Sequence, residues 1–186
     1  MTRIFLARHA EPEKSVGAAR ADGSLSRFGR SQADYLAERL LEFRPLKVVS
    51  GPSLRCKETA AFAAKRLGAS VTVDQRFTEV EPPRGTPNAN LWLMQNFRGD
   101  SATTWDQLDA NVNKWRAENL RAIAEVKENT VVFTHFININ AIVSSALHTP
   151  NTAVCRPDYA SITEISVVNG DIRLVLDGTE IKGPNE

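Results

Sequence analysis

The sequence predicts an α/β fold, a three-layer α/β/α sandwich with a mainly parallel sheet and a C-terminal antiparallel hairpin. Short apolar runs alternate with segments of helical periodicity up to about residue 148, which is typical of a parallel sheet with crossover helices. The run Thr130–Thr134 has an unbroken apolar centre, as expected for a strand buried on both faces. Asn169-Gly170 then separates two strand-like segments, and this dipeptide is favoured in tight hairpin turns.

In the first half of the chain, the pattern predicts a strand, a helix, a strand, a helix and a strand over Ile4–Ala7, Ser26–Phe43, Leu46–Val49, Leu54–Leu67 and Val71–Val73. Ser26 is a suitable N-cap for the first helix, and Gly68 a suitable residue just after the second. Prolines and a glycine make residues 78–90 irregular. The second half predicts helices, strands and a hairpin over Leu91–Phe97, Trp105–Lys127 (capped by Thr104), Thr130–Thr134, Ile137–Leu147, Ser161–Val168 and Ile172–Leu176.

Composition limits the class of protein. A chain of 186 residues with 42% hydrophobic and 24% charged residues suits one globular domain, and it excludes collagen, wholesale disorder and a disulfide scaffold. The net charge of +1 gives no footprint for nucleic acid or an anionic membrane. The cysteines, Cys56 and Cys155, form no ligand cluster, so we expect no metal and no cofactor. The sequence leaves the oligomeric state open between monomer and dimer.

Two segments bear on membranes and targeting. The apolar run near the N-terminus is only four residues long, too short for the core of a signal peptide, so a cytoplasmic location is expected. Residues 129–155 contain no Asp, Glu, Lys or Arg, yet they include two histidines, several asparagines and a proline. Polar groups at that density are costly in lipid, so a buried strand followed by a buried helix fits better than a membrane span.

Polar side chains follow three predicted strands at the point where each strand ends. Arg8-His9 follows the first, Ser50 ends the second with Arg55 just inside the next helix, and Thr134-His135 ends the fourth. The carboxyl ends of parallel strands meet at one edge of a sheet, where ligands bind in open α/β folds. Helix N-termini at the same edge add free N–H groups. The sequence therefore predicts a site for a phosphate-like dianion.

Five segments carry a resemblance to a known family, and they occur in the family's order. They are Leu6-Ala-Arg-His-Ala-Glu11, Leu25-Ser-Arg-Phe-Gly-Arg-Ser-Gln-Ala33, Ser50-Gly-Pro-Ser-Leu-Arg-Cys-Lys-Glu-Thr-Ala60, Phe77-Thr-Glu79 and Val131-Val-Phe-Thr-His135. Together they resemble the signatures of the histidine phosphatase superfamily, the phosphoglycerate mutase-like proteins. The resemblance implies a phosphoglycerate mutase-like fold over one domain, residues 1–186, and a small member of the phosphatase type.

The resemblance also implies roles for individual residues. His9 is the expected nucleophile, with Arg8, Arg55 and His135 around the phosphate and Glu79 as the proton donor. Neutral imidazole is a competent nucleophile near pH 7, and arginine offers a planar fork for phosphate oxygens. The leaving alkoxide needs a proton, which a carboxyl group beside the phosphate can supply. Glu81, two residues after Glu79, is the alternative acid.

The chain departs from the family pattern at the edges of this expected site. The glycine after the first histidine is Ala10, and the glycine after the second is Phe136, whose bulk could narrow the substrate range. The asparagine that mutases have several residues after the first histidine has no clear counterpart here, where the loop offers Lys14 and Ser15. Arg84 and Trp92 fall in residues 80–104, which we interpret either as core packing or as a lid over the site. Ser15, Phe136, Arg84 and Trp92 are therefore candidate substrate-pocket residues.

These inferences predict a metal-independent phosphomonoesterase that acts on a small phosphorylated substrate through a phosphohistidine on His9. The first alternative is a phosphoglycerate mutase, although mutase-type members are usually longer. The second is a non-catalytic regulatory protein that binds phosphate in an inactive pocket, an interpretation that Phe136 keeps open. A metallohydrolase using His9 and His135 has no supporting ligand motif.

Overall fold

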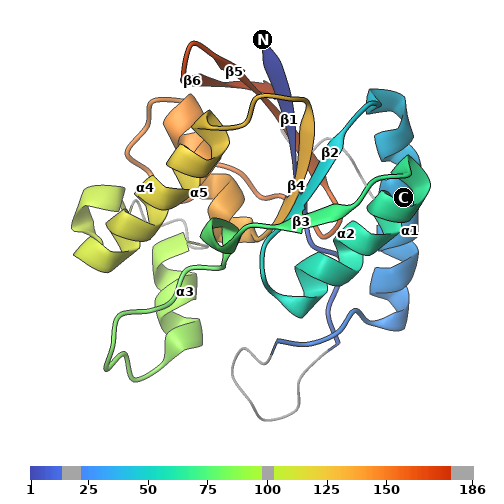
Figure 1. Cartoon of the computed structure of the whole chain (residues 1–186). Helices are drawn as coiled ribbons and strands as arrows, with labels where there is room; N and C mark the ends of the chain where they lie inside the picture. The colour runs from blue at the N-terminus through green and yellow to red at the C-terminus, as the bar shows by residue number, and fades with distance from the viewer. Residues whose placement is uncertain (14–21, 98–102, 177–186) are drawn as a thin grey trace.

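The sheet of this protein is mixed, with parallel strands in its centre and an antiparallel pair at one edge. The computed structural model describes residues 1–13, 22–97 and 103–176 (Figure 1). Within them the strand order is β3-β2-β4-β1-β5-β6. The strands span Thr2–Arg8 (β1), Lys47–Ser50 (β2), Val71–Val73 (β3), Thr130–Thr134 (β4), Ile162–Val168 (β5) and Asp171–Leu176 (β6). The strands β1 to β4 run parallel and β5 and β6 antiparallel, which confirms the predicted fold class.

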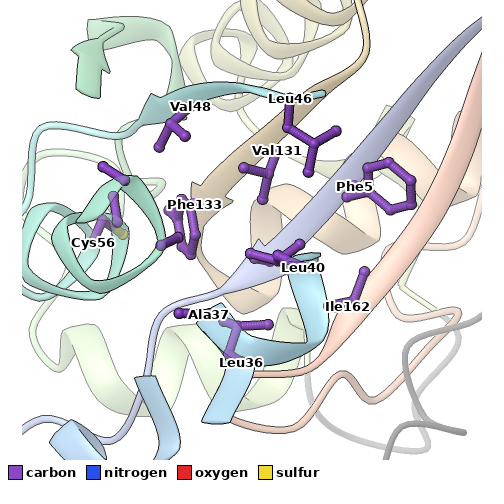
Figure 2. Close-up of a cluster of buried hydrophobic side chains, with 14 residues drawn as sticks. Phe5, Leu36, Ala37, Leu40, Leu46, Val48, Cys56, Val131, Phe133 and Ile162 are labelled. Carbon is purple, nitrogen blue, oxygen red and sulfur yellow. The ribbon is translucent and has the colours of Figure 1, made fainter. Parts of the chain in front are cut away.

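Helices cover both faces of the sheet because alternate strand residues point to opposite sides. On one side, Phe5 and Ala7 of β1 pack under α1 (Arg27–Leu40) and α2 (Leu54–Leu67), in the cluster that Figure 2 shows. On the other side, Ile4 and Leu6 pack under α4 (Ala110–Ala124) and α5 (Phe136–Ala146). Figure 1 shows the two helix pairs on either side of the sheet, so the architecture is the expected three-layer sandwich.

Local sequence signals account for several element ends. The Ser26 hydroxyl accepts a hydrogen bond from the Gly29 N–H and caps α1, which runs to Leu40 and continues as a 3₁₀ turn over Leu41–Phe43. The residue after α2, Gly68, has a φ of 64°, a conformation that glycine adopts without strain. Asn169 and Gly170 have φ values of 53° and 89°, as the tight turn between β5 and β6 requires.

One predicted helix is wrong in its extent. The segment expected to be continuous from Trp105 to about Lys127 is a 3₁₀ turn, Trp105–Gln107, followed by α4 from Ala110 to Ala124. Thr104 caps only the short turn, and Asp109 starts α4 by accepting a hydrogen bond from the Asn111 N–H. A second N-cap residue inside the segment therefore ends the first helical turn, a feature that apolar periodicity does not reveal.

The segment from Val80 to Phe97 leads away from the sheet and ends in α3 (Ala89–Phe97), which begins two residues earlier than predicted. Phe97 is fully buried and packs with Val80, Trp105 and Phe136, with Trp92 partly buried beside them. The charge-free stretch 129–155 holds β4 and the buried helix α5, as the sequence predicted. Among the described residues, no helix combines the length and the hydropathy that a membrane span needs.

Candidate active site

The carboxyl ends of β1, β2 and β4 lie at one edge of the sheet and bring the predicted residues together. The His9 N–H donates to the Thr134 carbonyl at 2.9 Å, which joins the end of β1 to the end of β4. The Gly51 N–H donates to the Phe133 carbonyl at 2.9 Å, which joins β2 to the same place. The rings of His9 and His135 are 5.2 Å apart between centroids. Two histidines and the start of α2, which carries Arg55, therefore share one site.

The hydrogen bonds of His9 define its tautomer. Its Nδ1 lies 2.9 Å from the Ala10 carbonyl oxygen, and because a carbonyl can only accept, Nδ1 carries the proton. Its Nε2 accepts a hydrogen bond from the Arg55 Nε at 3.3 Å. The ring is buried, with 6% of the residue exposed. The lone pair on Nε2 is thus directed into the site beside a fixed positive charge.

The surroundings of His9 keep its imidazole neutral. Burial lowers the pKa of His9 well below the usual 6.5, and the neighbouring His135, Arg8 and Arg55 lower it further. The hydrogen bond to the Ala10 carbonyl opposes this effect without reversing it. A neutral ring retains the lone pair that a nucleophile needs.

The lowered pKa gives a prediction about pH. In an NMR titration the imidazole signal of His9, assigned by comparison with His9→Gln, is expected to have its midpoint well below pH 6.5 in the native protein. In urea the same residue should titrate near its ordinary value. Between the two pKa values the unfolded chain binds the proton and the native protein does not, so the free energy of unfolding decreases as the pH falls below about 6.5. A native midpoint at or above 6.5 would contradict the neutral nucleophile.

Arg55 connects the groups of the site. Its Nη2 donates to the Glu79 Oε2 at 2.9 Å and to the His135 Nδ1 at 3.3 Å, in addition to the bond from Nε to His9. Because His135 accepts at Nδ1, its Nε2 carries the proton and faces the Ser53 hydroxyl at 3.4 Å. One guanidinium thus contacts both histidines and the predicted acid. Ser53, which also caps α2, belongs to this site, and the sequence marked it only as one member of the segment from Ser50 to Ala60.

Arg8 is held by the segment just before β5, which carries none of the motifs described above. Its Nη1 donates to the Pro157 carbonyl at 2.9 Å, and its guanidinium carbon lies 3.9 Å from the centroid of the Tyr159 ring. The same guanidinium carbon lies 5.5 Å from the centroid of the Phe136 ring. These distances fall within the range of cation–π contact. Tyr159 therefore borders the site, with its ring centroid 5.5 Å from that of His9. No sequence motif or spacing predicts this position.

The motif over residues 25–33 supports the backbone that follows His9. The Ser26 hydroxyl donates to the Glu11 carboxylate at 2.7 Å, and the Glu11 N–H donates to the Gln32 side chain at 2.9 Å. A Cβ on Gly29 would lie 2.0 Å from the Glu11 carbonyl oxygen, so only glycine permits this approach. The start of α1 therefore holds the chain directly after His9.

Comparison with known proteins agrees with this site. Residues 4–178 match the model of the histidine phosphatase superfamily, branch 1. The chain belongs to the histidine phosphatase superfamily. It is 34% identical, over 182 residues and 89% of each chain, to a putative phosphoserine phosphatase 2 of Hydrogenobacter thermophilus.

Two solved structures resemble this histidine phosphatase closely in fold. A mycobacterial glucosyl-3-phosphoglycerate phosphatase complexed with VO3 is 25% identical and has a TM-score of 0.72, with 95% of this chain and 98% of that chain covered. A phosphoserine phosphatase mutant (H9A) from Entamoeba histolytica, in complex with phosphoserine, has the same TM-score at 19% identity, covering 96% and 98%. The second likeness concerns the fold alone.

The remaining candidate site residues of this histidine phosphatase differ in their burial and in their contacts with the residues around His9. Phe136 is 9% exposed and packs on Arg8 and in the cluster that includes Trp92. Arg84 and Glu81 are exposed, whereas Glu79 contacts Arg55 with 20% of its side chain exposed. Ser15 lies outside the described residues. Of the two predicted acids, Glu79 is the one on the guanidinium that also contacts His9.

Proposed function

We propose that this histidine phosphatase hydrolyses a phosphate monoester through a covalent phosphohistidine on His9. The observation that carries the proposal is the placement of an unprotonated His9 Nε2 and the Glu79 carboxyl group on one guanidinium, that of Arg55. Nucleophile and acid are thereby held at a fixed spacing around a group that binds phosphate oxygens. Arg8 adds a second positive charge around the transferred group, and the neutral His135 ring lies beside the His9 ring.

The reaction follows in two steps. In the first, the lone pair of His9 Nε2 forms a bond to phosphorus while the bond from phosphorus to the ester oxygen breaks. The leaving oxygen takes the proton of the Glu79 carboxyl group, so an alcohol departs. In the second, Glu79, now a carboxylate, takes a proton from water as the water oxygen attacks phosphorus and the bond to Nε2 breaks. Arg8 and Arg55 stabilise the charge on the equatorial oxygens in both steps.

The substrate we propose is a small phosphorylated molecule, and the aromatic groups beside Arg8 suggest where the rest of it lies. Phe136 and Trp92 share one packed cluster, so we propose that they and α3 border the leaving-group side of the site. The relatives named for phosphoserine and glucosyl-3-phosphoglycerate supply the first compounds for a substrate panel.

The intermediate offers the direct test. After rapid mixing with ³²P-labelled substrate and quenching in alkali, where phosphohistidine survives, label is expected on His9. The rate in EDTA should equal the rate without it, which separates this enzyme from a metallohydrolase. Faster interconversion of 3- and 2-phosphoglycerate than release of phosphate would instead identify a mutase. A protein that releases phosphate from no ester in the panel would be the inactive binding protein.

The assignment of Glu79 predicts a dependence on the leaving group. Glu79→Gln is expected to slow alkyl phosphates by about a hundredfold, because the alkoxide then leaves without a proton. p-Nitrophenyl phosphate should be slowed far less, since p-nitrophenolate is weakly basic. Steady-state kcat/KM for both substrates measures the difference, and Glu81→Gln, an exposed carboxyl two residues away, is the control. Equal losses on the two esters would remove Glu79 from the role of acid.

A further inference from the structure

Two side chains from different helices bind the backbone carbonyl of Thr78, the residue directly before Glu79. Asn138 Nδ2 and Trp115 Nε1 each donate to this oxygen at 2.9 Å. Asn138 belongs to α5 and Trp115 to α4. A carbonyl oxygen has two lone pairs, so both of its acceptor positions are used. Neither donor takes part in the two chemical steps proposed for His9 and Glu79.

This carbonyl controls the position of the residue that follows it. The carbonyl of Thr78 and the Cα of Glu79 lie in one planar peptide unit, because rotation about the peptide bond is strongly hindered. Two donors arriving from different helices fix the direction of the C=O bond and with it the plane. The Glu79 side chain then starts from a fixed Cα, and its carboxylate reaches Arg55 at 2.9 Å.

The donors are themselves held in place by a second asparagine. Asn138 Nδ2 also donates to the Asn119 Oδ1 at 2.7 Å, and Asn119 Nδ2 donates to the Trp115 carbonyl at 3.0 Å. Both asparagines are fully buried. Burying an amide side chain costs free energy unless it is hydrogen-bonded. Two buried amides that bond to each other at one point of the core therefore indicate a specific role. Together with the bond from Trp115 Nε1, these hydrogen bonds form a closed ring that includes the Thr78 carbonyl.

The residue one position earlier, Phe77, is also contacted at its backbone carbonyl. The Thr134 hydroxyl lies 3.4 Å from the Phe77 carbonyl oxygen, and a Cβ on Gly51 would lie 2.4 Å from that oxygen. Thr134 directly precedes His135. Asn138 lies three residues after His135, one turn along α5. The segment that carries Glu79 is therefore attached to the same strand end and helix that carry His135.

We propose that Asn138, Trp115 and Asn119 are positioning residues that hold Glu79 at the leaving oxygen of the substrate. The inference rests on the proposed function, because it presumes that Glu79 donates the proton. None of the three is a catalytic residue, since they act through the Thr78 carbonyl.

The test compares two substrates, since a merely structural defect slows both alike. Trp115→Phe removes one donor and keeps the packing of a ring, and Asn138→Leu removes the other at similar volume. For each variant, kcat/KM is measured on glycerol phosphate and on p-nitrophenyl phosphate, because this ratio covers the first chemical step. We expect the alkyl ester to lose about tenfold more than the aryl ester, the size of effect that one lost hydrogen bond supports.

Trp105→Phe is the matched control. Trp105 Nε1 donates a hydrogen bond of the same length, 2.9 Å, but to the buried Ser144 hydroxyl rather than to Thr78. Thermal unfolding should show the larger loss of stability in Trp105→Phe, because Trp105 is the more deeply buried ring, while only Trp115→Phe should change the ratio between the substrates. A change of the ratio in Trp105→Phe as well would overturn the inference.

Glu79→Gln provides the reference and separates two kinds of failure. If Glu79→Gln changes the ratio and Trp115→Phe and Asn138→Leu do not, the positioning role is wrong and the proposed function stands. If Glu79→Gln leaves the ratio unchanged, the acid assignment fails and the positioning role fails with it. The double variant Glu79→Gln/Trp115→Phe should show no further change in the ratio, because the group being positioned is already lost.

Discussion

Replacing His9 by alanine is expected to lower kcat/KM by about a thousandfold or more on every substrate, since loss of a covalent nucleophile commonly costs at least that. Alkyl and aryl esters should both lose activity, because the first step on either ester forms the bond from His9 Nε2 to phosphorus. The variant should still bind orthovanadate or inorganic phosphate, since Arg8, Arg55 and His135 remain. Phosphate release under saturating substrate, with isothermal titration of phosphate, measures the two quantities.

The same His9→Ala protein should also take up no label from ³²P-substrate after an alkaline quench. Thermal unfolding of the variant shows whether the fold is intact, and His148→Ala, at an exposed histidine, serves as the control for removal of an imidazole. The phosphohistidine mechanism is abandoned if His9→Ala keeps the wild-type rate. Weak residual turnover with no labelled protein would be consistent with direct attack of water in a pocket that still binds phosphate.

Arg55→Lys is the second substitution with a large expected effect, although it conserves charge. The guanidinium contacts His9 through Nε and both Glu79 and His135 through Nη2, and an ammonium group is too small to span these positions. We expect kcat/KM to fall by about a hundredfold, the usual cost of removing one fixed donor to a developing charge. Both kcat and the affinity for phosphate should decrease, because the same group binds ground state and transition state.

Arg66→Lys provides the control for Arg55→Lys on the same helix. Arg66 also uses a guanidinium fork, on Asp34 and Glu38, but this network lies on the surface between α2 and α1. Its replacement should leave kcat/KM unchanged and cost at most about 1 kcal/mol of stability. If Arg55→Lys retains full activity, the guanidinium is not the group that organises the site.

The sequence predicted the strand ends of this site because their signals are local. A buried strand is apolar along its length, so a polar pair such as Arg8-His9 or Thr134-His135 directly after it is conspicuous. Parallel order follows from the alternation with helices, and it brings such pairs to one edge. The glycines of the motifs could be recognised as motif members, but the contact of Gly29 with the Glu11 carbonyl is visible only in three dimensions.

Sequence reasoning missed residues whose role depends on the return of a distant segment. Tyr159 lies between α5 and β5 in a stretch without a motif, and only the antiparallel pairing of β5 with β1 brings it onto Arg8. Asn138 is a polar residue in a largely apolar stretch, but its partner, the Thr78 carbonyl, is a backbone group that no side-chain pattern marks. Contacts of this kind are set by packing between elements, which periodicity within one element does not encode.

The position of β1 between β4 and β5 has a consequence for the order in which the protein can assemble. His9, Arg55 and Glu79 are all synthesised within the first 79 residues, yet β1 has no neighbouring strand until residues 130–134 have left the ribosome. Its second neighbour begins at Ile162. A nascent chain therefore carries most of its reactive groups long before it can hold them in place. Contacts so far apart in sequence form slowly, so phosphatase activity should appear only after synthesis of the whole sheet.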